Sequence, residues 1–333
     1  MNTLKDMQNL SMEEPKKSKG SKKLMVPPTP QTSRLGYGTG VGVYSMARGG
    51  ASNSQNLSPW ALKKVERKFK GQKVISDRLK VESKILKSLS HPNIIGFRGE
   101  GKTKDGRICL AMETCGTSLD ALMEKRREED LGPFPPDQIF KVAEGLCSAL
   151  HYLHQEKQLL HGDIKSFNVL IKGDFDQVKL CDFGTPVFLN KEGIAVDDTQ
   201  EYVGTEIWSA PEVLIDDIIS DKADIFSFGL TLWEMLSLDH PNIPSVSDSS
   251  MDSSTWSQDS DASIMECTST GTPINDSVME QSFTPGQKPK MPAELGPEYD
   301  VIIQLIDFCT IEDCTERPNA EQVLKFIQAN RKK

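Results

Sequence analysis

The sequence predicts an α+β fold in which a small β-rich part precedes a larger, mostly helical part. From residue 33 to about 112, short β-like runs dominate, namely "GVGVYSM", "WALKKV" and "ICLAME", and one helical pattern interrupts them around "DRLKVESKILKSL". After residue 116, the apolar residues recur at helical spacing. With 333 residues, the chain is long enough to bury a sizeable core in one large domain.

Periodic apolar residues locate the expected helices. In the β-rich part, the helical pattern carries an apolar stripe that includes Val81 and Ile85. Between 137 and 154, apolar side chains three and four positions apart predict an amphipathic helix, and two more are expected near 299–309 and 319–329. The stretch "ADIFSFGLTLWEML" is apolar nearly all round, which is typical of a helix buried in the middle of a large domain.

Two polar segments are expected to lie outside the packed core. Residues 1–29 contain Lys, Ser and Pro with few large apolar residues, which predicts a disordered tail whose lysines are either a nuclear-targeting patch or solvated charge. Residues 241–292 are expected to form a disordered insert, because positions 245–263 hold nine Ser and four Asp. Thr29 precedes Pro30 and is a candidate site for an upstream proline-directed kinase.

Composition and charge argue against several classes of protein. The net charge of −9 argues against nucleic-acid binding, which needs a basic surface. No stretch approaches the ~18 consecutive apolar residues of a membrane span, so no membrane association is expected. The seven cysteines include no C-x-x-C pair, as expected of reduced thiols in the cytoplasm or nucleus.

Residues suited to catalysis concentrate between Leu160 and Gly184, in "LHGDIKSFNVLIKGDFDQVKLCDFG". Asp163 and Asp182 each end a short apolar run, and a Lys and an Asn closely follow the first of them. These residue types suit phosphoryl transfer. One Asp positions the attacking hydroxyl, a second Asp and the Asn hold Mg²⁺, and the Lys offsets the charge of the transition state.

This stretch resembles the catalytic loop, H-R-D-x-K-x-x-N, and the D-F-G metal-binding motif of eukaryotic protein kinases. The resemblance implies catalytic roles for Asp163, Lys165 and Asn168. It also implies that Asn168 and Asp182 are ligands of Mg²⁺, and that ATP is the phosphoryl donor.

Further motifs of protein kinases follow in the expected order. "SPWALKK" resembles the strand that carries the phosphate-binding lysine, which implies Lys63 in this role with its neighbour Lys64 as the alternative. "ESKILKSLSHPNII" implies Glu82 as the partner of that lysine. The resemblance therefore implies a bilobal protein kinase domain, with a small lobe at about 30–113 and a large lobe at about 114–330.

The resemblance also implies which residues surround the nucleotide. Gly36 and Gly38 in "LGYGTGVGVYSM" are expected to bring a hairpin close over the phosphates, because residues without Cβ permit close backbone approach. Val41 stands where the third glycine of the fingerprint is expected, and no helix opens directly after the glycines, which argues against a dinucleotide-binding fold. The residues implied around the adenine are Val43, Ala61, the gatekeeper Met112, the backbone of Glu113 to Cys115, and Cys181.

In the helical part, "GTEIWSAPE" resembles the end of an activation segment. Glu212 belongs to its A-P-E motif, and Arg317 is the expected ion-pair partner. Asp224 in "DKADIFSFG" is expected to bind the backbone of the catalytic loop. Lys165 and Thr205 are the arrangement of Ser/Thr kinases, and these positions leave open whether tyrosine is also a substrate.

One departure from the kinase pattern is Gly162, which stands where most kinases carry the catalytic-loop Arg. A phosphate on either candidate site of the activation segment, Thr199 or Tyr202, would lack that guanidinium as its partner. Each such charge-assisted bond contributes about 1.5–3 kcal/mol. We therefore expect other contacts, or a partner protein, to order the segment.

Within the superfamily, stretches such as "LLHGDIKS" and "DKADIFSFGLTLWEM" resemble the PDZ-binding kinase family, which is MAP kinase kinase-like. This resemblance implies protein substrates that include MAP kinases, and a role in proliferation or mitosis. The chain ends with Lys332 and Lys333, which do not suit an apolar carboxylate-binding pocket, so PDZ-domain binding is not expected. The alternative function is a catalytically weak scaffold. Its mark would be the loss of a catalytic residue, and none is lost.

Overall fold

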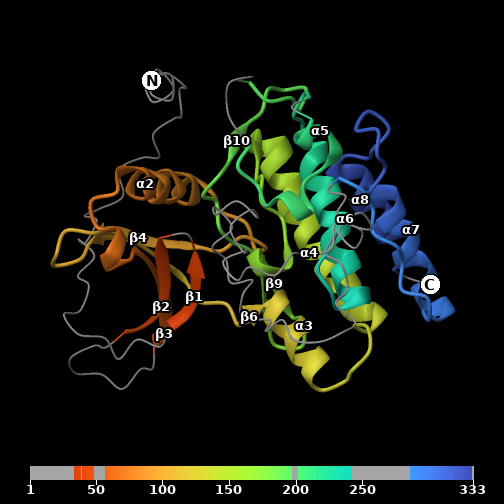
Figure 1. Ribbon diagram of the computed structural model, residues 1–333, viewed down its shortest axis with the longest axis horizontal. Coiled ribbons are helices and arrows are strands. Elements are labelled where there is room, and N and C mark those ends of the chain that lie inside the picture. Colours follow the sequence, from red (N-terminus) through yellow and green to blue (C-terminus); the bar gives the residue numbers. More distant parts are fainter. Residues whose placement is uncertain are drawn as a thin grey trace, which may run out of the picture.

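The computed structural model describes residues 34–38, 40–48, 57–196, 202–215, 217–241 and 286–331. The expected N-terminal tail, most of the expected insert, and the candidate phosphosites Thr29 and Thr199 lie outside these residues. The described chain forms two lobes, a smaller one built on a sheet and a larger one built on helices, which confirms the predicted α+β fold (Figure 1).

The small lobe contains a five-stranded antiparallel sheet in the order β1-β2-β3-β5-β4. Its strands are β1 (Arg34–Gly38), β2 (Val41–Arg48), β3 (Leu57–Val65), β4 (Phe97–Lys102) and β5 (Ile108–Glu113). One face of the sheet packs against α2 (Lys73–Ser88). On the other face, Leu62 packs with Met46, Cys109 and Ala111. Side chains alternate between these two faces along each strand.

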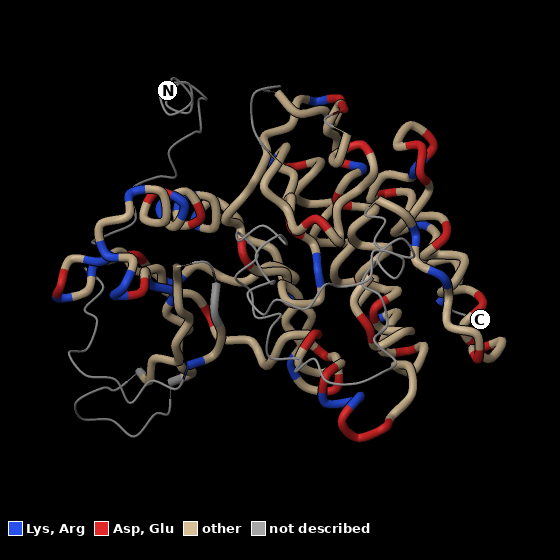
Figure 2. Tube along the Cα trace, in the orientation of Figure 1, with Lys and Arg blue, Asp and Glu red and all other residues tan. Residues whose placement is uncertain are grey.

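Helix α2 is amphipathic, as its apolar periodicity predicts. Leu79, Ile85 and Leu86 are buried in the core that it shares with the sheet. Lys and Arg outnumber Asp and Glu along the helix (Figure 2). Glu82 differs from the other charged residues because it is only 3% exposed. A buried carboxylate requires a charged or hydrogen-bonding partner, and Glu82 finds one on β3.

The large lobe packs its helices around one apolar helix. Its helices are α3 (Leu119–Glu128), α4 (Pro136–His151), α5 (Pro211–Leu214), α6 (Lys222–Ser237), α7 (Asp300–Cys309) and α8 (Ala320–Asn330). In α6, every residue from Ala223 to Leu236 is buried, as the apolar stretch predicts. Helices α4 and α7 contact α6, and α8 covers α4 (Figure 1). None of the described helices is long and apolar enough to cross a membrane.

Short strands and single helical turns connect the longer elements of the two lobes. β6 (Thr117–Ser118), β8 (Val169–Lys172) and β9 (Gln177–Leu180) form one antiparallel sheet, and β7 (Leu159–Leu160) pairs with β10 (Val187–Phe188). The single helical turns are η1 (Arg67–Phe69), η2 (Tyr152–Glu156), η3 (Ser166–Asn168), η4 (Glu206–Trp208) and η6 (Pro297–Tyr299). These elements are too short to show a periodic apolar pattern in the sequence.

The end of the large lobe begins inside the segment expected to be an insert. Residues 286–292 are described, and the carbonyl of Lys290 accepts a hydrogen bond of 3.0 Å from the indole N–H of Trp233 on α6. The packed domain therefore resumes no later than residue 286.

Further along the chain, α8 opens with a capping box, in which the side chains of Asn319 and Gln322 each accept a hydrogen bond from the other's backbone N–H.

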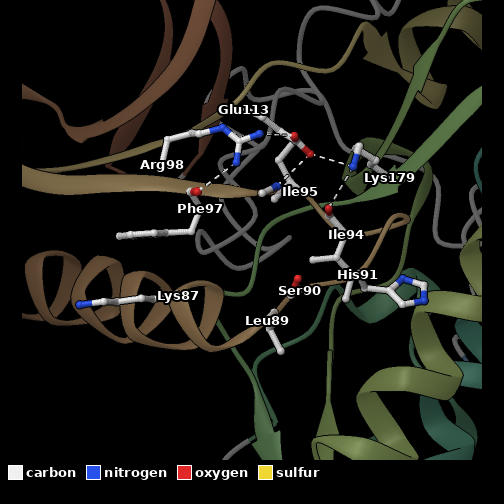
Figure 3. A pocket seen from close by; sticks show the side chains of 11 residues that line it. Lys87, Leu89, Ser90, His91, Ile94, Ile95, Phe97, Arg98, Glu113 and Lys179 are labelled. Atoms are coloured by element: carbon white, nitrogen blue, oxygen red, sulfur yellow. Dashed lines mark hydrogen bonds and ion pairs between the residues drawn. The ribbon is translucent and has the colours of Figure 1, made fainter. Parts of the chain in front are cut away.

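The carboxylate of Glu113, at the end of β5, links the two lobes. It accepts hydrogen bonds from the N–H of Gly96 at 2.9 Å and from the Arg98 guanidinium at 2.6 Å, and it ion-pairs with Lys179 of β9 at 2.8 Å. Figure 3 shows these groups lining one pocket near the C-terminal end of α2. One side chain thus connects the small-lobe strand β4 with the strand that leads to Asp182.

A second ion pair connects the start of α5 with the chain after α7. Arg317 is only 1% exposed and donates to both carboxylate oxygens of Glu212, at 2.6 and 3.0 Å. Its remaining donors bind the carbonyls of Ile311, Glu312 and Lys222. The pair expected from the sequence is therefore formed, and the guanidinium is surrounded by acceptors, as a buried charge requires.

We expect Glu113→Gln to lower the free energy of unfolding, because it weakens the contacts between the lobes, and we expect this effect to depend on pH. Burial alone would raise the pKa of Glu113, but the hydrogen bonds from Lys179 and Gly96 and the charges of Lys179 and Arg98 hold it below its usual 4.5. A lowered pKa contributes stability that is present above the unfolded value and lost as the pH falls through the folded value. At pH 7 the substitution should reduce the free energy of unfolding by about 1–2 kcal/mol.

Urea unfolding of the wild type and Glu113→Gln at several pH values measures this difference. The difference should shrink as the pH is lowered below 4.5, because Gln resembles the protonated acid. A difference that stays constant over this range would contradict a lowered pKa of Glu113 in the folded protein.

Arg317→Ala should destabilise the protein by about 3–5 kcal/mol, because it leaves the buried Glu212 carboxylate without its cation. Arg331→Ala is the matched control, since Arg331 pairs with Glu144 on the exposed surface and such pairs contribute about 0–1 kcal/mol. Denaturant unfolding measures both variants. Similar small losses in the two variants would show that the Arg317 pair does not carry the expected stability.

Candidate functional site

The loop between β7 and β8 brings three expected catalytic residues together with Thr205. Thr205 donates a hydrogen bond of 2.7 Å to Asp163, while Lys165 donates to the Thr205 hydroxyl at 2.6 Å. The Lys165 ammonium also ion-pairs with Asp163 at 3.0 Å. The amide nitrogen of Asn168 donates to the carbonyl and to the carboxylate of Asp163, at 2.8 and 2.9 Å. The four side chains form one continuous polar group.

The backbone of this loop is held by Asp224 on α6. The fully buried carboxylate accepts hydrogen bonds from the N–H groups of His161 and Gly162, at 2.8 and 2.9 Å, and bonds to Nε2 of His154 at 2.8 Å. Burial alone would raise the pKa of Asp224, but the hydrogen bond and charge of His154 lower it. Asp224 therefore stays ionised, and the loop backbone is fixed where the sequence motif predicts.

Asp182 follows β9 and lies beside the catalytic loop. The N–H of Cys181 donates to the carbonyl of Asn168 at 2.9 Å, and Nε2 of His161 lies 3.1 Å from the Cys181 carbonyl oxygen. Asp182 has a φ of +67°, which is uncommon for a residue other than glycine. The next residue, Phe183, is fully buried and meets the His161 ring edge-on. The expected metal ligands Asn168 and Asp182 thus lie at the same end of the β8–β9 hairpin.

Lys63 on β3 joins Asp182 to Glu82 on α2. Its ammonium lies 2.8 Å from an Asp182 carboxylate oxygen and 3.0 Å from a Glu82 oxygen. Because side chains alternate along a strand, Lys64 points to the opposite face, where its ammonium lies 3.9 Å from the centroid of the Tyr44 ring. Of the two lysines that the sequence leaves open, Lys63 is the one that faces the catalytic loop.

The charges of this group depend on one another. Burial opposes the charge on Lys63, but the carboxylates of Asp182 and Glu82 raise its pKa above the usual 10.5. Burial would raise the pKa of Asp182, yet the neighbouring Lys63 lowers it. Burial raises the pKa of Glu82 to about 7, although the charge of Lys63 opposes this shift. Lys63 and Asp182 are therefore charged at neutral pH, and Glu82 is the acid that takes up a proton first.

The residues expected around the adenine lie on adjacent strands. Val43 is on β2, and Ala61 of β3 is paired with Met112 of β5. Ala61, Met112 and Cys115 are buried. The Cys115 sulfur lies 3.9 Å from the carbonyl oxygen of Leu170 on β8, a partly buried residue that the sequence analysis does not single out. The feature of the sequence that would have indicated Leu170 is its place on the strand that directly follows the catalytic loop.

Two of the expected pocket residues are limited in what they can contribute. The side chain of Glu113 is bound in the network that joins the lobes, and its backbone N–H donates to the Gly96 carbonyl at 2.9 Å, so neither group is left for a ligand. For Cys181, burial and the charge of Asp182 raise the pKa of the thiol. Cys181 is therefore a packing residue and not a reactive thiolate.

The glycine-rich stretch forms the β1–β2 hairpin. A Cβ on Gly36 would meet no atom of the described residues within 4 Å, so their packing does not require glycine there. Gly38 is paired with Val41 at the end of the hairpin. Gly40 has a φ of +72°, and a Cβ there would lie 2.3 Å from the Ile75 side chain. Gly40 thus serves the turn, whereas Gly36 leaves open space against which a ligand can approach the backbone.

Glu234 on α6 is a residue of this site that the sequence analysis misses. Its buried carboxylate accepts hydrogen bonds from the hydroxyl of Ser166 at 2.7 Å and from the indole N–H of Trp208 at 3.0 Å. Nδ1 of His240 lies 3.1 Å from the same carboxylate. Glu234 therefore connects the catalytic loop with the segment that contains Thr205. A lone Glu near the end of an otherwise apolar helix is the signal in the sequence.

Of the three candidate phosphosites, Tyr202 lies within the described residues. The residue is partly buried, its ring lies beside the backbone of Gly162 and Gly204, and its hydroxyl interacts with the Ser227 side chain. The ring packs against the cluster that contains Trp208, and the expectation of a phosphosite at Tyr202 stays a prediction.

The donor set at this site suits a magnesium–nucleotide ligand. Mg²⁺ is usually held by one or two carboxylates together with phosphate oxygens and waters. Asp182 offers a carboxylate, of which one oxygen is paired with Lys63. The nitrogen of the Asn168 amide faces Asp163, which leaves the amide oxygen for a ligand. The ammonium of Lys63 adds a positive charge that suits phosphate.

Comparison with known proteins agrees with this geometry. The sequence matches the family described as "Protein kinase domain" over residues 31–326. It is 41% identical over 311 residues to the human lymphokine-activated killer T-cell-originated protein kinase. The match covers 92% of this chain and 91% of that protein.

Two further relatives match over about half of the chain. Identity is 36% over 180 residues to mitogen-activated protein kinase kinase kinase 13-B of Xenopus laevis, and 35% over 170 residues to mitogen-activated protein kinase kinase kinase dlk-1 of Caenorhabditis elegans. These matches cover 52% and 51% of this chain, and 17% of each relative. The family match spans both lobes and includes the polar group around Asp163, and so this chain belongs to the protein kinase family.

Proposed function

We propose that this protein is a Ser/Thr kinase that transfers the γ-phosphoryl group of ATP to hydroxyl groups of protein substrates. The observation that supports this most strongly is the polar group formed by Asp163, Lys165 and Thr205. It combines a carboxylate that can accept a proton with a cation that can stabilise transferred charge. It lies beside the Asp182 carboxylate, at the same end of the β8–β9 hairpin.

Asp163 and Lys165 act on the substrate hydroxyl and on the transferred group. Asp163 orients the hydroxyl and accepts its proton as the hydroxyl oxygen bonds to the γ-phosphorus and the bond from that phosphorus to the leaving ADP breaks. The ammonium of Lys165, 3.0 Å from this carboxylate, offsets the negative charge that develops on the γ-phosphoryl oxygens. Asn168 donates to Asp163 and so keeps the carboxylate oriented.

The second group of residues holds the nucleotide. Lys63, positioned by Glu82, pairs with the α- and β-phosphates, and Asp182 and Asn168 hold Mg²⁺. Bound Mg·ATP supplies the phosphoryl group and the divalent cation that neutralises its charge. Gly36 allows the β1–β2 hairpin to cover the phosphates closely, which limits the access of water.

The substrate class is supported by Thr205. Its hydroxyl bridges Asp163 and Lys165, so the floor of the site lies close to the catalytic carboxylate and suits the short side chains of Ser and Thr. The relatives named as mitogen-activated protein kinase kinase kinases support a place in a MAP kinase cascade, with MAP kinases among the substrates. We place this activity in the cytoplasm or nucleus and in proliferating cells.

Lys63→Met should reduce Mg·ATP-dependent phosphorylation by about 100-fold or more, because it removes the cation that holds the phosphates. Lys64→Met is the matched control and should retain activity close to that of the wild type, since Lys64 faces Tyr44 on the opposite side of the sheet. Transfer of labelled phosphate to a general protein substrate measures both. Equal background activity in the wild type and both variants would favour the scaffold function instead.

Asp163→Asn should lower kcat by about 10²–10⁴-fold while nucleotide affinity stays unchanged, because it removes the proton acceptor and leaves the phosphate-binding residues in place. Asp174→Asn, on the exposed turn after β8, serves as the control. The assay uses peptides that are identical except for a Ser, Thr or Tyr acceptor. A kcat close to that of the wild type would contradict the role of Asp163, and a faster reaction with Tyr would contradict the substrate class.

A further inference from the structure

The backbone at Gly162 does not accommodate the side chain that most kinases carry at this position. Gly162 has a φ of +79°, a conformation that L-residues rarely adopt. A Cβ there would lie 2.9 Å from the carbonyl oxygen of Thr185 and 3.7 Å from the ring of Tyr202. A larger residue would therefore strain the catalytic loop and displace the chain that follows Phe183.

The ring of Tyr202 occupies the space beside this glycine. A Cβ on Gly204 would lie 2.3 Å from the Tyr202 ring and 2.6 Å from the carbonyl oxygen of Gly162. Both glycines thus allow the ring and the two backbone segments to approach closely. Tyr202 also packs against the buried cluster that contains Leu160 and Trp208. The ring therefore lies between the catalytic loop and the end of the activation segment, against this buried cluster.

The hydroxyl end of Tyr202 reaches α6. It interacts with the side chain of Ser227, whose hydroxyl donates to the carbonyl of Trp208 at 2.7 Å. Ser227 lies one turn after Asp224, which holds the backbone of His161 and Gly162. Tyr202 and the catalytic loop are thus attached to the same turn of the same buried helix.

We propose that Tyr202 is a positioning residue whose ring fixes the end of the activation segment against the catalytic loop, so that Thr205 stays within hydrogen-bonding distance of Asp163. This inference rests on the proposed kinase function. Thr205 follows Tyr202 by three residues, so the anchored ring limits how far the Thr205 hydroxyl can move from Asp163. A neutral aromatic side chain thereby does what an Arg paired with a phosphate is expected to do in most kinases.

The surroundings of Tyr202 favour a neutral phenol. Burial raises the pKa of Tyr202 well above its usual 10.0, and the charges of Asp224, Asp163 and Glu212 raise it further. A phosphate on this hydroxyl would place a dianion among the same three carboxylates. The close approach of the ring to Gly162 and Gly204, together with these charges, fits a packing role and not a role as an acceptor of phosphate.

The test compares Tyr202→Ala and Tyr202→Phe with the wild type. Tyr299→Ala is the matched control, because Tyr299 lies in η6 of the same lobe, outside the site. For peptide phosphorylation, kcat should fall about 10–100-fold in Tyr202→Ala, while KM for ATP and the affinity for Mg·ADP stay within about twofold. Tyr202→Phe keeps the ring and should retain at least about one third of kcat, and Tyr299→Ala should match the wild type.

Three results would overturn the proposal. The first is an unchanged kcat in Tyr202→Ala. The second is an equal loss in Tyr202→Phe, which would assign the effect to the hydroxyl instead of the ring. The third is a parallel loss of nucleotide affinity, which would indicate general damage to the fold rather than a displaced activation segment.

Hydrogen exchange gives a readout that does not depend on activity. The amides of His161 and Gly162, which donate to Asp224, should exchange at least about tenfold faster in Tyr202→Ala, with the amides of α8 unchanged. A wild-type protein without phosphoryl transfer would refute the proposed function, and this comparison would still decide whether Tyr202 positions the loop. Unchanged exchange at both amides would refute the positioning role.

Discussion

The carboxylate of Asp224 is the contact on which the geometry of the catalytic loop depends. A fully buried charge is stable when its oxygens are hydrogen-bonded, and both carboxylate oxygens of Asp224 are bonded, through His154 and the N–H groups of His161 and Gly162. Those two N–H groups belong to the residues directly before Asp163. The position of the catalytic carboxylate is therefore set by the buried helix α6. Because protein interiors are close-packed, α6 cannot shift without opening the core of the large lobe.

Two ion pairs connect the small lobe with β9 and with the residues that directly follow this strand. Lys63 reaches Asp182, directly after β9 and Cys181, and Glu113 reaches Lys179 within β9. Both pairs are partly or fully withdrawn from solvent, so their attraction is screened less than that of surface charges. A displacement of one lobe would disturb both pairs together. The orientation of the lobes and the position of the D-F-G aspartate are thus coupled through β9.

The activation segment is anchored in this structure by packing and buried hydrogen bonds. Trp208 donates to Glu234, Glu212 pairs with Arg317, and the ring of Tyr202 lies against Gly162. Each contact connects the segment to a buried part of the large lobe. A kinase whose loop lacks the usual Arg can in this way hold its substrate-binding end in place. The glycine that removes a charged contact also creates the space for an aromatic one.

The sequence by itself determined the α+β fold class, the long helices and the identity of the catalytic motif, because periodicity and short motifs are local properties of the chain. Helix α6 and the polar residues from Asp163 to Asp182 are examples. The tertiary structure alone decided which groups meet across long separations. Tyr202 is a candidate phosphosite by sequence and, in the fold, a ring packed against Gly162 and Gly204, and Glu234 gains its role only where α6 passes beneath the catalytic loop. No local pattern encodes such contacts, since they depend on how separate segments pack against one another.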